Sequence, residues 1–206
     1  MSTYMPPIMA PFATIKCPAC SGAAKFAFAT YQIFQKKDYT YFSKSRNFEV
    51  FRGQHFHGSY YQAALYYPGL GNSLENVTDL PDGYEANMWR HPYWYVTLPK
   101  ELENAGAIRC SSCLIQKKHN LKWPEDAYFQ ITYKGQVLWA FDRKYALNLL
   151  SYIESKERTK RIVGYSGKPW NTIISQDWFL RHIPEHFQTA KARPEIVKKL
   201  KSILGT

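Results

Sequence analysis

The stretch IRCSSCLIQKKHNLKW, residues 108–123, places two cysteines three positions apart, just ahead of a cluster of lysines. A second pair with the same Cys-x-x-Cys spacing, Cys17 and Cys20, stands in TIKCPAC near the N-terminus. This spacing lets one tight turn direct two thiolates at a single tetrahedral ion. Because the two pairs contain all four cysteines of the chain, they predict one zinc site with Cys17, Cys20, Cys110 and Cys113 as its ligands.

Two other interpretations of the cysteines stay open. A redox dithiol needs one Cys-x-x-Cys at the start of a helix, whereas TIKCPAC resembles a strand that enters a turn. The thiols can also be structural, with no metal. The pairs are separated by 89 residues, far more than the roughly 15 to 20 of a compact zinc ribbon. We therefore expect an inserted segment between them, although separate sites, or ligation by His55 and His57, are alternatives.

The composition favours a polyanionic partner. The chain has 206 residues, a net charge of +11 and 17% aromatic residues. Positive charge attracts phosphates and aromatic rings stack on unpaired bases, so we expect a nucleic-acid ligand. Neither a signal peptide nor an apolar run of membrane-spanning length is apparent, which predicts a cytoplasmic protein with no membrane partner. Residues 114–206 hold 17 Lys and Arg against 8 Asp and Glu and form the more basic part.

The order of features predicts an α+β fold. Residues 1–125 should form a zinc-binding region in which a pair of zinc knuckles brackets an aromatic-rich insert, about 23–106, made mostly of strands and loops. Residues 126–206 should form a β-hairpin and a basic helical region. The alternation around Lys134-Gly135 indicates the hairpin, with the glycine in its turn.

Three helices are expected in the C-terminal region. Asp142 should cap the first, in which Ala146, Leu149 and Ile153 fall on one apolar face. The second should begin near Ser175. The third should follow Pro194 and end at Gly205, because proline suits the first turn of a helix and glycine its C-terminal end.

Enzymatic motifs are incomplete. The segment GYSGKPWN, residues 164–171, lacks the spacing and the hydroxyl of a phosphate-binding loop and is predicted to be a turn. The signatures of zinc deaminases, HExxH proteases and GxSxG hydrolases are missing from the sequence. We therefore expect no catalytic residues.

A second candidate site lies in KKDYTYFSKSRNFEVFRGQHFHGSYY, residues 36–61, where cations alternate with aromatic residues. Charge for phosphates and flat rings for bases in one stretch are typical of a nucleic-acid path, although alternating aromatics also form one face of a sheet. Together with two lysines that follow the second cysteine pair, the predicted nucleic-acid contacts are Lys36, Lys37, Lys44, Arg46, Arg52, Lys117 and Lys118.

The two distant Cys-x-x-Cys pairs, the aromatic insert, the segment VLWAFDRKYALNLLSYI and the basic end FLRHIPEHFQTAKARPEIVKKLKSIL resemble the zinc-finger-bearing, large-subunit-like protein of type IV CRISPR effector complexes. Only the four cysteines form a motif in this resemblance. It implies a non-catalytic subunit of an RNA-guided antiviral complex, near the 5′ end of the guide RNA. Its partners would be guide RNA, target DNA and the other subunits, and it would contact the duplex that carries the target-flanking motif.

Two other functions are compatible with the sequence. A free-standing zinc-dependent regulator would bind duplex DNA by itself, often as a dimer. A nuclease would need carboxylates for divalent metal, and the acidic residues of this chain are few and scattered.

Overall fold

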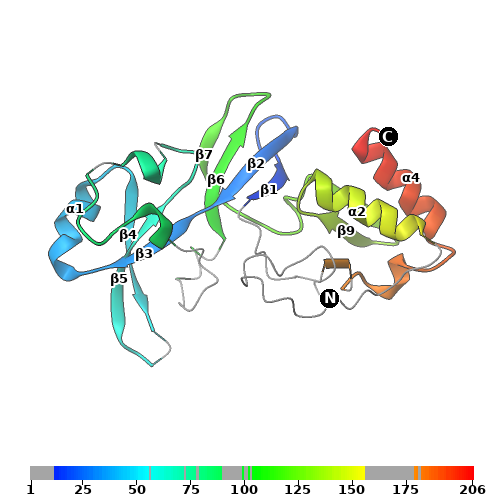
Figure 1. The fold of residues 1–206 in the computed structure, drawn as a ribbon. Coiled ribbons are helices and arrows are strands. Elements are labelled where there is room, and N and C mark those ends of the chain that lie inside the picture. Colours follow the sequence, from blue (N-terminus) through cyan, green and yellow to red (C-terminus); the bar gives the residue numbers. More distant parts are fainter. Residues whose placement is uncertain are drawn as a thin grey trace. The chain divides into compact units, whose positions relative to one another are not determined.

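A computed structural model describes residues 12–155 and 179–206, except for 56, 72, 78, 90–98, 100, 101, 103 and 181. In this part the protein is α+β, as predicted, with three α-helices and several antiparallel strand pairs (Figure 1). The chain divides into two compact units, residues 17–122 and residues 1–16 together with 123–206. The second division falls between Lys122 and Trp123, and the first strand belongs with the C-terminal residues.

The unit of residues 17–122 carries all four cysteines. Three of its strands, β2 (Ala23–Phe28), β6 (Ala105–Cys110) and β7 (Gln116–Asn120), pair antiparallel in the order β2-β6-β7. Ala24 lies opposite Cys110 and Phe26 lies opposite Ile108, so the side chains alternate between the two faces. Gly106 lies so close to the ring of Phe26 and the carbonyl of Ala27 that a side chain there has no room. The lack of a side chain at position 106 therefore allows β2 and β6 to approach each other.

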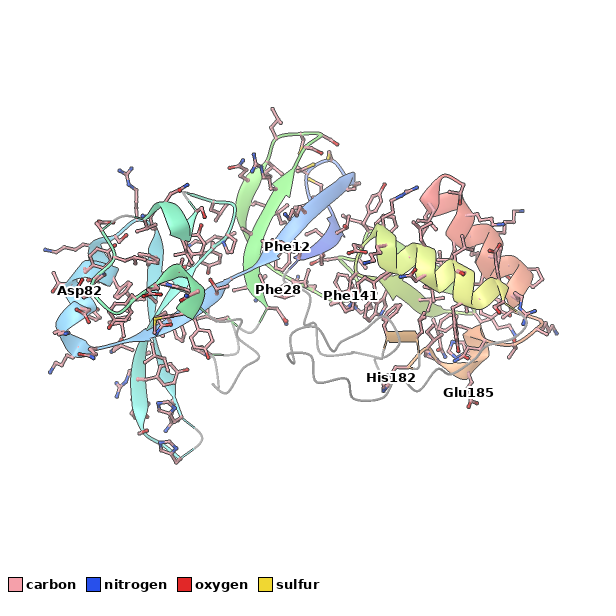
Figure 2. The ribbon with its side chains drawn as sticks, viewed as in Figure 1. Phe12, Phe28, Asp82, Phe141, His182 and Glu185 are labelled. Atoms are coloured by element: carbon pink, nitrogen blue, oxygen red, sulfur yellow. The ribbon has the colours of Figure 1, made fainter. Side chains whose placement is uncertain are left out.

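A second antiparallel sheet in this unit has the order β3-β5-β4, with β3 Thr30–Phe34, β4 Phe48–Gln54 and β5 Tyr60–Tyr66. Between β3 and β4 lie a 3-10 turn, η1 (Lys36–Asp38), and a short helix, α1 (Tyr39–Lys44). Two further 3-10 turns follow β5, η2 (Leu74–Asn76) and η3 (Ala86–Met88). The insert was predicted to be mostly strand and loop, and the short helix α1 was not predicted. Figure 2 shows Asp82 at the surface, in a turn with Gly83.

Each face of the β3-β5-β4 sheet covers its own apolar cluster. Residues that alternate along the strands fall into two sets. On one face Tyr31, Tyr61 and Leu65 pack with Ala105 and Ala107 of β6, so this face joins the sheet to the cysteine-bearing strands. The opposite face holds an aromatic cluster beneath α1, formed by Phe34, Phe42, Ala64, Tyr66, Tyr84 and Trp89. The β3-β5-β4 sheet therefore lies between two apolar clusters within the unit of residues 17–122.

The other unit is built on a hairpin and two helices. Strands β8 (Phe129–Tyr133) and β9 (Gln136–Ala140) pair around Lys134 and Gly135, whose φ angles of 47° and 75° match a two-residue hairpin turn. Strand β1 (Phe12–Lys16) joins this unit through a hydrogen bond from the Thr14 N–H to the Phe141 carbonyl, 2.7 Å. Figure 1 shows α2 (Arg143–Glu154) and α4 (Arg193–Leu204) side by side, with the 3-10 turn η5 (Glu185–Phe187) between them in sequence.

The predicted cap of α2 and the predicted end of α4 are confirmed, whereas α4 begins at Arg193 and so includes Pro194. The Asp142 side chain accepts a hydrogen bond from the Tyr145 N–H, 2.9 Å, at the start of α2. Pro194 lies in the first turn of α4, and Gly205 ends it in the left-handed conformation at φ 69°. The helix expected near Ser175 and the turn expected at 164–171 lie outside the described residues, except for Phe179 and Leu180, which are helical. No helix in the described part is long and apolar enough to cross a membrane.

Candidate metal centre

The two cysteine pairs lie in turns with the same backbone design. The N–H of Cys17 donates to the Gly22 carbonyl at 2.8 Å, and the N–H of Cys110 donates to the Ile115 carbonyl at 3.0 Å, so each turn spans six residues. The fourth residue after the first cysteine has a positive φ in both, 59° at Ser21 and 60° at Leu114. Left-handed backbone is uncommon outside glycine and folds the chain back sharply. Two segments distant in sequence therefore present their cysteines in the same way.

The tertiary structure brings all four sulfurs together. Their Sγ atoms all lie within 4.8 Å of one another, with 3.5 Å between Cys17 and Cys113 and 3.6 Å between Cys20 and Cys110. These distances are far longer than the roughly 2.05 Å of a disulfide, and all four cysteines are free. Cys17 and Cys110 are buried whereas Cys20 and Cys113 are exposed. The four residues can therefore hold one metal ion at the edge of the unit.

Backbone N–H groups stabilise the charged form of the first sulfur in each turn. The N–H groups of Cys113 and Ser112 point at Cys110 and lower its thiol pKa to about 6, against the opposing effect of burial. Burial raises the pKa of the Cys17 thiol, but the N–H groups of Ala19 and Cys20 outweigh it and lower that pKa below its usual value. The backbone of each turn therefore favours the thiolate form of the first cysteine.

The second sulfur of each turn has the opposite tendency. The N–H of Gly22 lowers the pKa of Cys20, but hydrogen bonds with neighbouring thiols and burial raise it to about 12. The N–H of Ile115 likewise lowers the pKa of Cys113. Burial of this thiol and its hydrogen bonds with the sulfurs of Cys17 and Cys110 raise that pKa above its usual value. Four negative sulfurs at these distances repel one another, so full deprotonation needs a bound cation.

The two histidines that were an alternative ligand pair lie elsewhere. His55 and His57 flank the turn between β4 and β5, with parallel rings 5.1 Å apart. The Ser59 hydroxyl and the Nε2 atom of His57 are 2.9 Å apart. In the described part of the chain the four cysteines form the one group of three or more potential metal ligands, and no histidine belongs to it.

The predicted basic contacts are divided between two places in the insert. Lys36, on η1, and Arg52, on β4, line one pocket with Tyr60 and Gln62. Lys44, at the end of α1, and Arg46, in the next turn, line another. Lys37 is exposed on η1. All five cations lie on the β3-β5-β4 part of the unit, whereas the lysines that follow the second cysteine pair lie on β7.

The two β7 lysines differ in their surroundings. Lys117 is exposed. Lys118 forms an ion pair with Glu49, 2.5 Å between Nζ and Oε2, and its ammonium lies 4.6 Å from the centre of the Tyr67 ring. Tyr67 also donates a hydrogen bond to Glu49, 3.2 Å. Lys118 therefore compensates a charge within the unit and ties β7 to β4, which leaves it less available to a phosphate.

Most aromatic residues interleaved with these cations belong to the core. Phe42 is fully buried, and Phe48 stacks on Trp89 with ring centres 5.0 Å apart. Phe48 lies on β4, as the sheet-face alternative expects, whereas Phe42 packs against the sheet from the helix α1. Among the described rings of this stretch, Tyr39 is 46% exposed and Tyr60 is 61% exposed, and Tyr60 carries the Arg52 guanidinium 3.9 Å above its centre. Sequence reasoning missed Tyr60, although it stands eight residues after Arg52 across a predictable hairpin.

Comparison with known proteins gives no relative: no protein-family model, no curated protein and no solved structure matches the chain.

Proposed function

We propose that the four cysteines bind one zinc ion. Ligands about 2.3 Å from a tetrahedral zinc have sulfurs about 3.8 Å apart, close to the 3.5 and 3.6 Å of the two shortest pairs. An all-thiolate tetrahedral set suits zinc or an iron–sulfur centre, and the two matching turns support the prediction of a pair of zinc knuckles. The ion would then join the two ends of the inserted segment, because one pair precedes β2 and the other begins at Cys110, the last residue of β6.

Elemental analysis tests the metal. Protein purified without added metal should contain about one zinc per chain, as a single four-thiolate site requires. Colour and iron in place of zinc would identify an iron site instead. Two zinc ions per chain, or none in a protein that keeps its native fold, would contradict the single shared site.

We further propose that the protein is a non-catalytic subunit of an RNA-guided, type IV CRISPR-like effector complex, in which it binds guide RNA and the duplex carrying the target-flanking motif. The observation that supports nucleic-acid binding most is the Arg52–Tyr60 pair. An exposed guanidinium stacked on an exposed ring, with Lys36 lining the same pocket, presents charge and a planar surface together. The resemblance in the order of sequence features supports the more specific assignment.

The position of this pair suits such a role. Gln54 and Tyr60 are paired at the hairpin end of β4 and β5, and Arg52 is paired with Gln62 beside them. These four residues lie on the same sheet face as the aromatic cluster beneath α1. Unlike the cluster, they are exposed or half-buried. Figure 1 shows the β4–β5 hairpin extending beyond α1. The outer end of the hairpin is therefore free to contact a duplex, while the part of the hairpin beneath α1 packs in the core.

Substitution of Arg52 tests the nucleic-acid contact. Arg52→Ala should weaken target binding with zinc content and assembly unchanged. If Arg52 reads a base, the flanking-motif preference should relax by about 1 to 3 kcal/mol of discrimination. If it contacts a phosphate, binding should fall uniformly, and the dependence on log salt should become shallower by about one. Quantitative filter binding over a salt series distinguishes these results.

Lys144→Gln is the matched control, because it removes an exposed charge from α2 in the other unit. Equal losses for Arg52→Ala and Lys144→Gln would indicate general electrostatics and contradict a defined site. Co-purification with RNA and partner subunits would support the complex. Duplex binding by the isolated chain would favour a regulator, and turnover of nucleic acid with added divalent metal would favour a nuclease.

A further inference from the structure

The four cysteine sulfurs are placed to bond to one another as well as to hold an ion. Two sulfur pairs are in direct contact, and both join one turn to the other: Cys17 with Cys113 at 3.5 Å and Cys20 with Cys110 at 3.6 Å. Their members are 96 and 90 positions apart in the sequence, so only the fold brings them together. Each pair has to approach by about 1.5 Å to reach the roughly 2.05 Å of a disulfide.

Each of these pairs combines an exposed cysteine with a buried one. Cys113 and Cys20 are exposed, whereas their partners Cys17 and Cys110 are 1% exposed. An oxidant in solution therefore meets Cys113 and Cys20 first, with a buried sulfur in contact with each. A sulfenic acid is reversible when a neighbouring thiol condenses with it, whereas further oxidation to sulfinic and sulfonic acids is not. A partner already in contact favours the reversible outcome.

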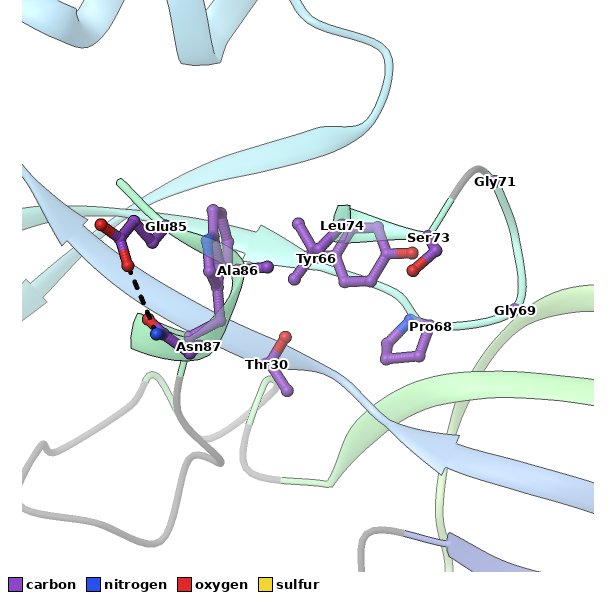
Figure 3. Close-up of a pocket in the computed structure, with 11 residues that line it drawn as sticks. Thr30, Tyr66, Pro68, Gly69, Gly71, Ser73, Leu74, Glu85, Ala86 and Asn87 are labelled. Carbon is purple, nitrogen blue, oxygen red and sulfur yellow. Dashed lines mark hydrogen bonds between the residues drawn. The ribbon is translucent and has the colours of Figure 1, made fainter. Parts of the chain in front are cut away.

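The exposed cysteines do not line the pocket that Figure 3 shows. That pocket, of about 690 Å³, has Thr30, Tyr66 and Asn87 among its described walls and none of the four cysteines. Cys20 and Cys113 are instead reached from the surface of the unit. This position suits a small diffusible peroxide, which reacts without a pocket to hold it.

The competing disulfides would lie within each Cys-x-x-Cys turn. In the first turn the Cys17 N–H donates to the Gly22 carbonyl and the Ser21 N–H to the Cys17 carbonyl, both at 2.8 Å. The second turn repeats the first of these contacts, from Cys110 to Ile115 at 3.0 Å. Because these hydrogen bonds hold the backbone of each turn, the sulfurs already in contact, those of opposite turns, are the ones expected to bond.

We propose that peroxide converts the metal centre into two disulfides, Cys17–Cys113 and Cys20–Cys110, which release the ion and keep the two turns joined. This inference rests on the proposed zinc centre, because it gives the same four sulfurs a second, covalent state. The two disulfides then take over the role of the ion in connecting the ends of the inserted segment. The unit of residues 17–122 should therefore stay folded after the metal has left.

The chemistry needs one peroxide for each disulfide. The Cys113 sulfur, a thiolate while it holds the ion, attacks a peroxide oxygen; the O–O bond breaks, hydroxide leaves and a sulfenic acid forms on Cys113. The Cys17 thiolate attacks that sulfur, so the S–S bond forms and the S–O bond breaks to release a second hydroxide. Two protons convert the hydroxides to water. Cys20 and Cys110 repeat these steps, and the ion is left without thiolate ligands.

Peptide mapping of the oxidised, full-length protein tests which cysteines are joined. Trypsin cleaves on both sides of each cysteine pair and recovers the turns as CPACSGAAK, residues 17–25, and CSSCLIQK, residues 110–117. After treatment with hydrogen peroxide, mass spectrometry should find these two peptides as one linked species. Partial reduction in acid, followed by alkylation and fragmentation, should release Cys17 together with Cys113. Zinc released to a chromogenic chelator and unchanged circular dichroism should accompany the linked species.

The same oxidation in guanidinium chloride is the matched control. In an unfolded chain, cysteines of one Cys-x-x-Cys pair meet more often than cysteines 90 positions apart, by on the order of 100-fold from loop-closure entropy. The unfolded sample should therefore give two separate peptides, each with an internal disulfide. The folded sample should reverse this preference, because its contacts between the turns replace the random encounters of the chain.

Zinc analysis before oxidation separates this inference from the proposed metal centre. A zinc-loaded chain that forms disulfides only within its turns, or only sulfinic and sulfonic acids, would overturn the inference and leave the metal centre standing. Pairing of Cys17 with Cys110 would overturn it too, as would linked peptides from a chain that has lost its circular dichroism. A folded chain without zinc that forms the two expected disulfides would support the covalent state and contradict the metal centre.

Discussion

Cys110→Ser should unfold the unit of residues 17–122 and release its metal, rather than merely weaken binding. Cys110 is 1% exposed at the end of β6, and a shared ion would tie this strand to the turn before β2. The metal closes a long loop, so its binding free energy becomes folding free energy. The expected loss is several kcal/mol, comparable with the whole stability of a small domain. Circular dichroism, thermal unfolding and metal analysis of the variant measure it.

Cys113→Ser separates metal ligation from ordinary packing. Cys113 is exposed, so a thiol without metal there contributes little to a core and its replacement should be nearly neutral. With a shared ion, Cys113→Ser should be as damaging as Cys110→Ser. Ser112→Ala, an exposed change in the same turn, should have little effect on stability. A stable Cys113→Ser variant beside an unfolded Cys110→Ser variant would show that Cys110 acts through packing, which would contradict the metal centre.

Phe42→Ala should destabilise the same unit by about 3 to 5 kcal/mol, the usual cost of removing a buried phenylalanine. Phe42 is fully buried beneath α1, where its ring stacks on Phe34 at 4.7 Å and meets Tyr84 edge-on at 5.2 Å. Neighbouring rings enclose the Phe42 side chain, so its removal would leave a cavity that is closed to water. Urea unfolding monitored by circular dichroism measures the change.

Tyr39→Ala is the control for Phe42→Ala. Tyr39 lies on the same short helix and also contacts Phe34, 6.3 Å between ring centres, but it is 46% exposed. Its loss should cost about 1 kcal/mol or less, as most exposed substitutions do. Similar losses for the two variants would mean that burial in the aromatic cluster does not set the cost of removing a ring from α1, which would contradict the prediction.

Local patterns in the sequence predicted the C-terminal elements closely. Lys134-Gly135 occupies the turn of its hairpin, Asp142 caps α2, and Gly205 ends α4. Each of these depends on hydrogen bonds or backbone angles of a few consecutive residues, so the sequence contains the necessary information. The short helix α1 was not predicted, because its six residues have no full apolar period and it forms against the aromatic cluster.

The amino-acid sequence by itself determined the α+β class, the C-terminal hairpin and helices, and the identity of the four cysteines as one candidate ligand set. Only the tertiary structure decided that the sulfurs of Cys17 and Cys113, 96 positions apart, lie 3.5 Å from each other. It also decided which cations are compensated, since Glu49 meets Lys118 across two sheets, and which ring is exposed under Arg52. The spacing of residues in the sequence determines which side chains one turn brings together. Contacts between distant segments depend on how the strands pair and how the apolar clusters pack.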